Sequence, residues 1–416
     1  MENNKEQYNL YTEKIKQSPF EKYKLLFDLG KLVLKAVFTG IIIALTFLAI
    51  MGLYWDDDKQ VENQRKEVNI PLDEEPDKNI TQVEPDDKNI TDGNGNATES
   101  IIRETDLYSR VEDIIASVSA SVTTVTAVAE NEDPLFSVIQ NSVDYPGIII
   151  ADNEVEYLVL TDAAIADANL IRVTLNDGKV IPASFVMADR LLDMAIIAIG
   201  HEELGTMGIQ KLPIITMGNS YMLKQGELVV SVGNLFGIHS AVDFGMVVNS
   251  EQVLYEADSR HRMIYTNMHG AKSCSGFLFN EDGEVVGFIS KNNSVQNVVA
   301  YGISDIKVRI QNITNNRRIG YMGVIGLEVD EKHAELHKIP VGVCVTSIRP
   351  DSPAYNAGII NGDIITDISG RTITNLYNIE RAMCEFEPGT QVTVTVYRKG
   401  KKEYVPMEFT VTLGER

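Results

Sequence analysis

The feature that most constrains this chain is a long series of short apolar or alternating segments between residues 105 and 315. Examples are SVTTVTAV, YLVLTD, IRVTLNDG and GELVVSVG, and turn sequences such as Asn176-Asp177-Gly178 separate them. Alternating segments of this length are typical of β-strands, and many of them at regular spacing favour an all-β barrel or sandwich. We therefore expect a mainly β fold for this part of the chain, and periodicity alone takes the prediction no further.

The composition of the 416-residue chain argues against several classes of protein. A formal net charge of −22 argues against nucleic-acid binding, because a phosphate backbone requires a basic face. The three cysteines, Cys274, Cys344 and Cys384, are too few for a disulfide scaffold, and no CxxC pair suggests a zinc site. We expect neither a metal nor a cofactor, and the length predicts two or three domains.

Residues 36–55 read AVFTGIIIALTFLAIMGLYW and contain no charged side chain. About 20 apolar residues suffice to cross the hydrocarbon of a bilayer as one helix. Lysines precede the run and Asp56, Asp57 and Asp58 follow it, so the positive-inside rule places residues 1–35 in the cytoplasm. The sequence thus predicts a single-pass cell-membrane protein with its C-terminal domains outside. The alternative, a cleaved signal peptide, is disfavoured by the length of the run and by the lack of a small-x-small cleavage site.

The next segment, residues 56–104, is acidic, polar and poor in large apolar side chains. Such a segment cannot bury enough surface to offset the entropy of ordering it. It contains the near-repeat EPDKNIT and EPDDKNIT, which is typical of a charged tether that can expand in length. We predict a disordered linker here.

Three stretches of the middle region carry a resemblance to a known family. They are LVLTDAAIADANLIRVTLNDGKVIPASFVMADRLLDMAIIAI at 158–199, PIITMGNSYMLKQGELVVSVGNLFGIHSAVDFGMVVNS at 213–250, and GFLFNEDGEVVGFIS at 276–290. In this order they resemble the first barrel, the second barrel and the segment after the nucleophile of HtrA/DegP-type serine proteases. The resemblance implies a trypsin-like double β-barrel over residues 105–315, with a cleft between the barrels. It also suggests homotrimers.

The resemblance locates three catalytic positions, and two of them are altered. The family's base lies in a T-N-x-H-V motif, where this chain reads TDAAI, so Ala164 stands in place of the histidine. A D-x-x-x-D-[LM]-A pattern retains the acid as Asp193. The motif G-N-S-G-G-P-L becomes KSCSGFL, which puts Cys274 at the nucleophile position. A methyl group cannot accept the nucleophile's proton, so ordinary serine proteolysis is not expected.

Alternatives stay open at this site. A one-residue gap in the alignment makes Ser275 the nucleophile, and a cysteine nucleophile needs less help from a base than a serine does. His269 is near Cys274 in the sequence, but the family's imidazole comes from the other barrel. Lys272 takes the place of a glycine whose N–H helps to form the oxyanion hole, and Ser273 follows it in this altered oxyanion loop. Changes at the base, the nucleophile and the oxyanion loop together indicate a pseudoprotease.

Residues 320–412 indicate a separate α/β domain. The run SPAYNAGIINGDII at 352–365 is similar to the signature S-P-A-x-x-A-G-[IL]-x-x-G-D-x-I of PDZ domains. The resemblance implies a helix–strand groove that binds an extended peptide by β-augmentation, with the peptide carboxylate held by the N–H groups of a short loop. This loop matches Tyr321, Met322, Gly323 and Val324. The residues expected to flank the groove are Ile325, Leu327, Ile379 and Met383. The alternative is that these apolar side chains only fill the core.

Together these features predict a membrane-anchored HtrA-like pseudoprotease. We expect it to bind C-terminal or unfolded segments of exported proteins, in protein quality control or as a scaffold for active HtrA relatives. The alternative is an active endopeptidase with a rearranged site that uses Cys274 or Ser275. A third interpretation is a surface sensor whose cytoplasmic tail reports a ligand in the cleft, but the tail carries no recognisable signalling motif.

Overall fold

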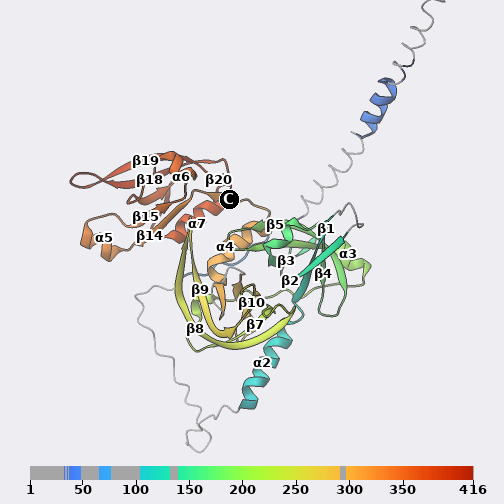
Figure 1. Cartoon of the computed structure of the whole chain (residues 1–416). Helices are drawn as coiled ribbons and strands as arrows, with labels where there is room; N and C mark the ends of the chain where they lie inside the picture. Colours follow the sequence, from blue (N-terminus) through green and yellow to red (C-terminus); the bar gives the residue numbers. More distant parts are fainter. Residues whose placement is uncertain are drawn as a thin grey trace, which may run out of the picture. The chain divides into compact units, whose positions relative to one another are not determined.

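The structure of the protein is a computed structural model (Figure 1). It describes residues 32, 35, 37–47, 65–75, 104–131, 139–290 and 297–415. The chain divides into two compact units, residues 1–64 and residues 65–416. The two units are described one at a time below.

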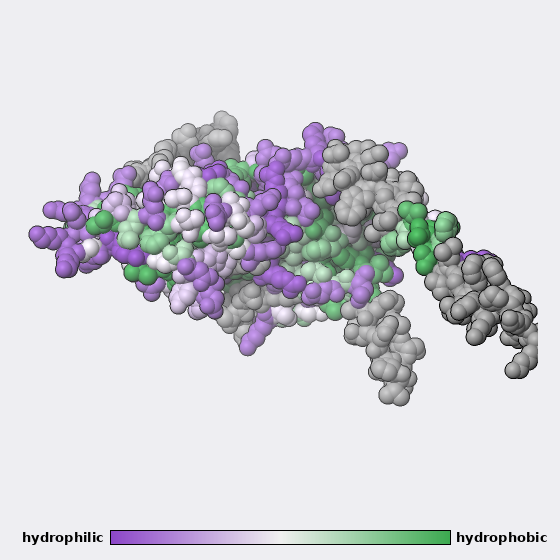
Figure 2. Space-filling view, turned by 90° about the horizontal axis from the view of Figure 1, so that it is seen from above, coloured by the Kyte–Doolittle hydropathy of each residue, from purple (hydrophilic) through white to green (hydrophobic). Residues whose placement is uncertain are grey.

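The first unit contributes a helical segment at residues 37–47. Its apolar side chains are exposed, for example Val37 at 55%, Phe38 at 66% and Phe47 at 61%, and they form the green segment at the right of Figure 2. No helix in the described part of the chain is long and apolar enough to cross a membrane. The remainder of the predicted span, Ala36 and residues 48–55, lies outside the described residues.

The second unit begins with an extended segment, residues 65–75, which differs from the expected disordered linker. The backbone N–H of Val68 donates to Oδ1 of Asn315, and the N–H of Ile70 donates to Oε1 of Gln311, both at 2.9 Å. Ile70 is only 6% exposed and joins the main hydrophobic core. The apolar residues of the short run VNIPL therefore bury enough surface to dock this segment, although the average composition of residues 56–104 is acidic and polar. The other linker residues, 56–64 and 76–103, lie outside the described residues.

Helix α2 (Glu104–Val118) leads into a closed six-stranded antiparallel barrel. Its strands are β1 (Val122–Asn131), β2 (Ile139–Asp152), β3 (Glu156–Asp162), β4 (Leu170–Thr174), β5 (Val180–Asp189) and β6 (Met194–Gly200), paired in the order β1-β2-β3-β6-β5-β4. Strands β3 and β6 are apolar on both faces because both faces are buried. Val159 and Ile197 point into the barrel, and Leu158 and Ile196 belong to a core shared with the next barrel. Strand side chains alternate between two faces, which explains this division.

A second closed six-stranded barrel follows, so the predicted double-barrel fold is confirmed. Its strands are β7 (Leu228–Asn234), β8 (Ala241–Glu256), β9 (Ser259–His269), β10 (Ser275–Phe279), β11 (Val285–Ile289) and β12 (Asn297–Gly302), in the order β10-β11-β12-β9-β8-β7. Short helical turns connect the strands at η1 (Ala163–Asp167), α3 (His201–Thr206) and η2 (Ser220–Met222). Helix α4 (Ile303–Thr314) ends this part of the chain, and its apolar face packs into the shared core.

The C-terminal domain is an α/β unit with its own core. One sheet has the order β14-β15-β16-β18-β19, and β17 pairs with β16. These strands are β14 (Val324–Val329), β15 (Gly342–Ile348), β16 (Ile364–Ile368), β17 (Arg371–Thr372), β18 (Gln391–Lys399) and β19 (Tyr404–Thr412). A second, two-stranded sheet pairs β13 (Gly320–Tyr321) with β20 (Gly414–Glu415). The helices are α5 (Glu331–His337), α6 (Pro353–Ala357) and α7 (Leu376–Glu385). Asn375 caps the N-terminus of α7, and its side chain accepts the N–H of Asn378.

Candidate functional site: altered catalytic positions and a carboxylate-binding loop

Ala164 lies exposed in the turn η1, directly after strand β3. Its backbone N–H donates to Oδ1 of Asp162 at 2.9 Å, and the N–H of Ala163 donates to the backbone carbonyl of Asp193 at 3.1 Å. The structure therefore brings the predicted base position and the predicted acid position together at one end of the first barrel. The side chain at position 164 is a methyl group, which can neither accept nor deliver a proton.

Asp193 has a positive φ of 60° in the turn between β5 and β6. Burial, followed by the carboxylates of Asp162 and Asp193, raises the pKa of Tyr145. This tyrosine is therefore close to both acids, and its phenol keeps its proton at neutral pH. Tyr145 is consequently no substitute for the missing histidine as a general base.

Cys274 is 1% exposed and belongs to the core of the second barrel, together with Leu223, Met268 and Val298. A Cβ added at Gly270 would lie 3.1 Å from the Cys274 sulfur, so the surroundings of the thiol are tightly packed. Burial raises the pKa of the Cys274 thiol. A reactive cysteine needs exposure and a lowered pKa, and Cys274 has neither.

Of the other predicted residues near Cys274, some are buried in the core and others are exposed at the surface. Ser275 opens β10 opposite Asn234 and is 2% exposed, and its hydroxyl has no hydrogen-bond partner within the described residues. Lys272 and Ser273 are exposed. His269 lines an open hollow with Lys272 and three neighbouring residues, and Cys274 is not part of that lining. Cys274 is buried, and no hydrogen bond joins it to His269 among the described residues, so the structure gives no support to a His269–Cys274 dyad.

The remaining five histidines have other neighbours. His201 and His239 face Asp152 and Asp144, with N–O distances of 2.9 and 3.7 Å. His261 is fully buried with its ring against Tyr301. His333 and His337 belong to α5 in the C-terminal domain. Among the described residues, no hydrogen bond, ion pair or ring contact joins any of these histidines to Ala164.

The predicted carboxylate-binding loop already holds a carboxylate. The backbone N–H groups of Met322 and Gly323 donate to Oδ2 of Asp258 at 2.8 and 2.7 Å, and the N–H of Val324 donates to its Oδ1 at 2.8 Å. Asp258 lies in the turn between β8 and β9 and is 2% exposed. Three convergent N–H donors form a concavity suited to an anion. The loop can therefore hold a carboxylate, and its binding of a peptide carboxylate stays a prediction. Sequence reasoning missed Asp258 as the group that contacts this loop.

Gly323 is required for the shape of this loop. Its φ of +90° lies in the region that favours glycine, and an added Cβ would lie 2.3 Å from Cβ of Ser352. The loop is held from behind because the carbonyl groups of Met322 and Gly323 accept the N–H groups of Ala354 and Arg349, both at 2.9 Å. The three donors are thus fixed in place before any ligand arrives.

The predicted groove residues are distributed unevenly. Leu327 on β14 is 49% exposed, and Ile325 is half-buried. Ile379 and Met383 on α7 are fully buried in the core of the C-terminal domain. They correspond to the alternative in which these side chains fill the core, because they share one face of α7 with Leu376 at three- and four-residue spacing.

A buried cluster of charges was not predicted from the sequence. Arg309 of α4 contacts Glu380 of α7 through Nε, and its Nη1 lies 2.8 Å from Oδ2 of Asp189 at the end of β5. Burial raises the pKa of Glu380 to about 7, although Arg309 opposes the shift. Burial also acts to raise the pKa of Asp189, but Arg309 outweighs it and the pKa is lowered. The three side chains connect the first barrel, α4 and the C-terminal domain.

Comparison with known proteins agrees with both domains. Residues 146–288 match a family model described as "Trypsin-like peptidase domain", and residues 322–408 match one described as "PDZ domain". The chain is 28% identical over 265 residues to a "Probable periplasmic serine endoprotease DegP-like" of Chlamydia pneumoniae, covering 60% of this chain and 52% of that protein. It is 26% identical to "Periplasmic serine endoprotease DegP" of Escherichia coli K12, covering 62% and 56%. The chain thus spans about half the length of these relatives.

Solved structures show the same fold. The structure "HtrA-type protease AlgW with tripeptide" matches with a TM-score of 0.52 at 20% identity and covers 73% of this chain and 97% of that chain. A second structure, "HtrA-type protease AlgW with decapeptide", matches with a TM-score of 0.50 at 20% identity, covering 73% and 98%.

Proposed function

The chain resembles HtrA-type PDZ proteases in its two matched domains, and from this premise we propose that it is a non-proteolytic homologue that binds peptides. Its ligands are C-terminal or unfolded segments of exported proteins. The carboxylate-binding loop captures the free carboxylate of such a segment, and strand β14 pairs with the residues before it.

The loss of peptide hydrolysis rests on one observation, the methyl group of Ala164 at the position of the base. Acyl transfer needs an acceptor for the nucleophile's proton and a donor for the leaving amine. The burial and raised pKa of Cys274 support the same conclusion, because a buried thiol is a poor nucleophile.

The place of action that we propose is the outer face of the cell membrane. The uncharged run at 36–55 anchors the chain, and the two folded domains face the exported proteins that they bind. Periplasmic relatives and the exposed apolar side chains at 37–47 support this proposal. A homotrimer, or association with active HtrA relatives, would fit a role in protein quality control or as a scaffold.

The test uses the full-length protein in detergent micelles and unfolded casein as the substrate. We expect casein to cross-link to the protein while mass spectrometry finds no new casein termini. The matched control is Cys274→Ala, which should behave like the wild type in both assays. If the wild type cleaves casein and Cys274→Ala does not, the chain is an active protease with a rearranged site and the proposal is wrong.

A further inference from the structure

The tip of the β8–β9 hairpin contacts the C-terminal domain at its carboxylate-binding loop. Glu256 and Ser259 pair across the turn, so Ala257 and Asp258 form its tip. Figure 1 shows the two long strands reaching from the second barrel to β14 and α7, and residue contacts join β8 to β14 and β9 to α7. Ala257 and Ser259 are fully buried. An exposed hairpin tip is the usual arrangement, so the burial of this tip requires a specific partner.

Asp258 makes the contacts that a bound peptide terminus would make. Its carboxylate accepts the three loop N–H groups, and its own backbone N–H donates to the carbonyl oxygen of Val324 at 2.7 Å. A carboxylate in an N–H loop next to a main-chain hydrogen bond on the first strand is the pattern of peptide capture by strand addition. The φ of Asp258 is +61°, a conformation that aspartate and asparagine tolerate better than most residues.

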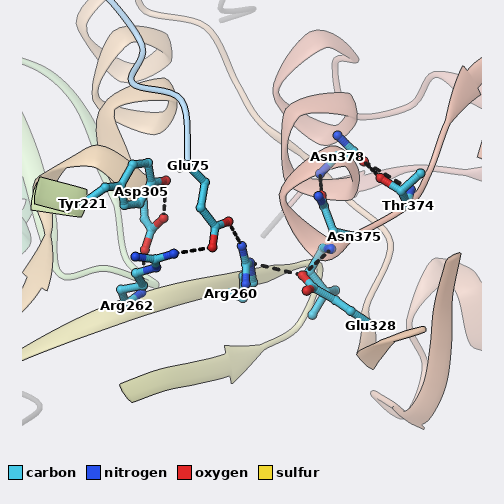
Figure 3. Close-up of polar contacts among 10 residues, drawn as sticks. Glu75, Tyr221, Arg260, Arg262, Asp305, Glu328, Thr374, Asn375 and Asn378 are labelled. Carbon is cyan, nitrogen blue, oxygen red and sulfur yellow. Dashed lines mark hydrogen bonds and ion pairs between the residues drawn. The ribbon is translucent and has the colours of Figure 1, made fainter. Parts of the chain in front are cut away.

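Charged groups beside the turn hold it in place (Figure 3). Arg260, the second residue of β9, pairs with Glu328 of β14 at 3.1 Å, and it also contacts Glu75 of the extended N-terminal segment. Glu75 contacts Arg262 as well, and Glu328 accepts the N–H of Leu376 at the start of α7. These contacts are made with β14 and with the start of α7, which would border a bound peptide. They therefore hold the β8–β9 turn over the groove.

An external peptide cannot use the loop while Asp258 occupies it. Each of the three N–H groups has one hydrogen and already donates it, and a second carboxylate at the same place would meet like charge. The hairpin is part of the same chain, so it competes at a high effective concentration. A cavity of about 430 Å³ is lined in part by Asp258 and Tyr321.

We propose that the β8–β9 turn is the resident ligand of the carboxylate-binding loop, and that a free C-terminus binds only after Asp258 leaves it. This inference rests on the proposed peptide-binding function and adds its regulation. By linkage, peptide binding releases the hairpin of the second barrel, and any contact that holds the hairpin lowers the apparent affinity for peptide.

The test measures peptide binding by fluorescence polarisation with full-length protein in detergent micelles. The probe is a fluorescein-labelled pool of decapeptides with a free carboxylate and apolar last residues, and an amidated pool serves as the control. Asp258→Asn and Asp258→Gly both suit the positive φ and remove the negative charge. We expect at least about tenfold tighter binding of the free-carboxylate pool to both variants. Glu251→Gln, an exposed change on β8, should bind like the wild type.

A second readout is independent of peptide. Amide hydrogen exchange at Met322, Gly323 and Val324 should be slow in the wild type and in Glu251→Gln, and at least about tenfold faster in Asp258→Asn. Equal peptide affinity in the wild type and both Asp258 variants would overturn the inference while the proposed function stands. Suppose instead that neither the wild type nor the Asp258 variants bind the free-carboxylate pool, although exchange at the loop is faster in Asp258→Asn. The proposed peptide-binding function is then wrong, and the inference that Asp258 competes with peptide is wrong with it.

Discussion

At the scale of single residues, the proposed loss of peptide hydrolysis rests on Ala164, yet we expect that a histidine at this position would not restore activity. We expect Ala164→His to leave casein uncleaved, because the thiol of Cys274 remains in the core of the second barrel and keeps its proton. Stability should change by less than about 0.5 kcal/mol, since Ala164 is exposed. The measurement is casein degradation by the full-length variant beside the wild type. New casein termini with the variant alone would show that the nucleophile is accessible after all.

The resemblance assigns the altered positions but does not predict which of their side chains are buried. Alignment to a motif placed Ala164 and Cys274, and the structure finds one exposed and the other buried. Asp258 was missed because the turn sequence Glu-Ala-Asp-Ser does not indicate whether the turn is exposed to water or packed against a second domain. Its partners Met322 to Val324 are more than sixty residues away along the chain, and no local pattern reports such a contact.

At the scale of elements, the extended segment 65–75 makes a prediction about stability. Ile70→Ala should lower the free energy of unfolding by about 2 kcal/mol, because it removes a side chain buried against α4. Leu72→Ala is the matched control, since Leu72 is 36% exposed and should cost far less. Urea unfolding of the full-length variants measures both. Equal effects of the two substitutions would mean that the segment is not docked.

Helix α7 makes a prediction about pH. The pKa of Glu380 is raised to about 7 in the folded protein from an ordinary value of 4.5, so the folded state holds a proton that the unfolded state has lost. Stability therefore falls as the pH rises from about 5 to about 8. Asp189, whose pKa is lowered, changes its charge only at more acidic pH.

We expect Glu380→Gln to reduce this fall by about 2 kcal/mol, because the glutamine has no proton to lose. Glu385→Gln, an exposed change on the same helix, should leave the pH dependence unchanged. Urea unfolding at both pH values provides the measurement. Parallel pH profiles for the wild type and Glu380→Gln would contradict the raised pKa.

Elements differ in how far the sequence predicts them. The strands follow from alternation and turns, as in LIRVT, where every second residue is buried. The ordered segment at 65–75 was not predicted, because residues 56–104 are acidic and polar on average. Its few apolar residues nevertheless suffice to dock it. The buried Arg309 cluster was not predictable, because Asp189, Arg309 and Glu380 lie in three separate elements. Arg309 and Glu380 have the sequence context of ordinary surface charges, and the D-x-x-x-D-[LM]-A pattern that begins at Asp189 does not indicate its partner.

At the scale of the whole molecule, the uncharged run at 36–55 predicts the cellular fraction of the protein. Deletion of these residues should move the chain from the membrane to the soluble fraction, because this uncharged run is the anchor that we propose. Deletion of residues 76–95 in the linker should leave the protein in the membrane fraction. Carbonate extraction of membranes followed by immunoblotting measures the distribution. Retention of the 36–55 deletion in the membrane would contradict the anchor.

The domain order and both folds were predictable because two unrelated signatures, one in each domain, agree with the strand pattern. The way in which the domains contact each other was not predictable, because it depends on Asp258 and Arg309, which no motif contains. The central claim, that the altered catalytic positions leave this chain unable to hydrolyse peptides, is tested most directly by intact mass spectrometry. Full-length protein is exposed to a fluorophosphonate and, separately, to a peptide chloromethyl ketone, with free peptide present. We predict no adduct on Ser273, Cys274 or Ser275, and stoichiometric modification of Cys274 or Ser275 in the native protein would contradict the claim.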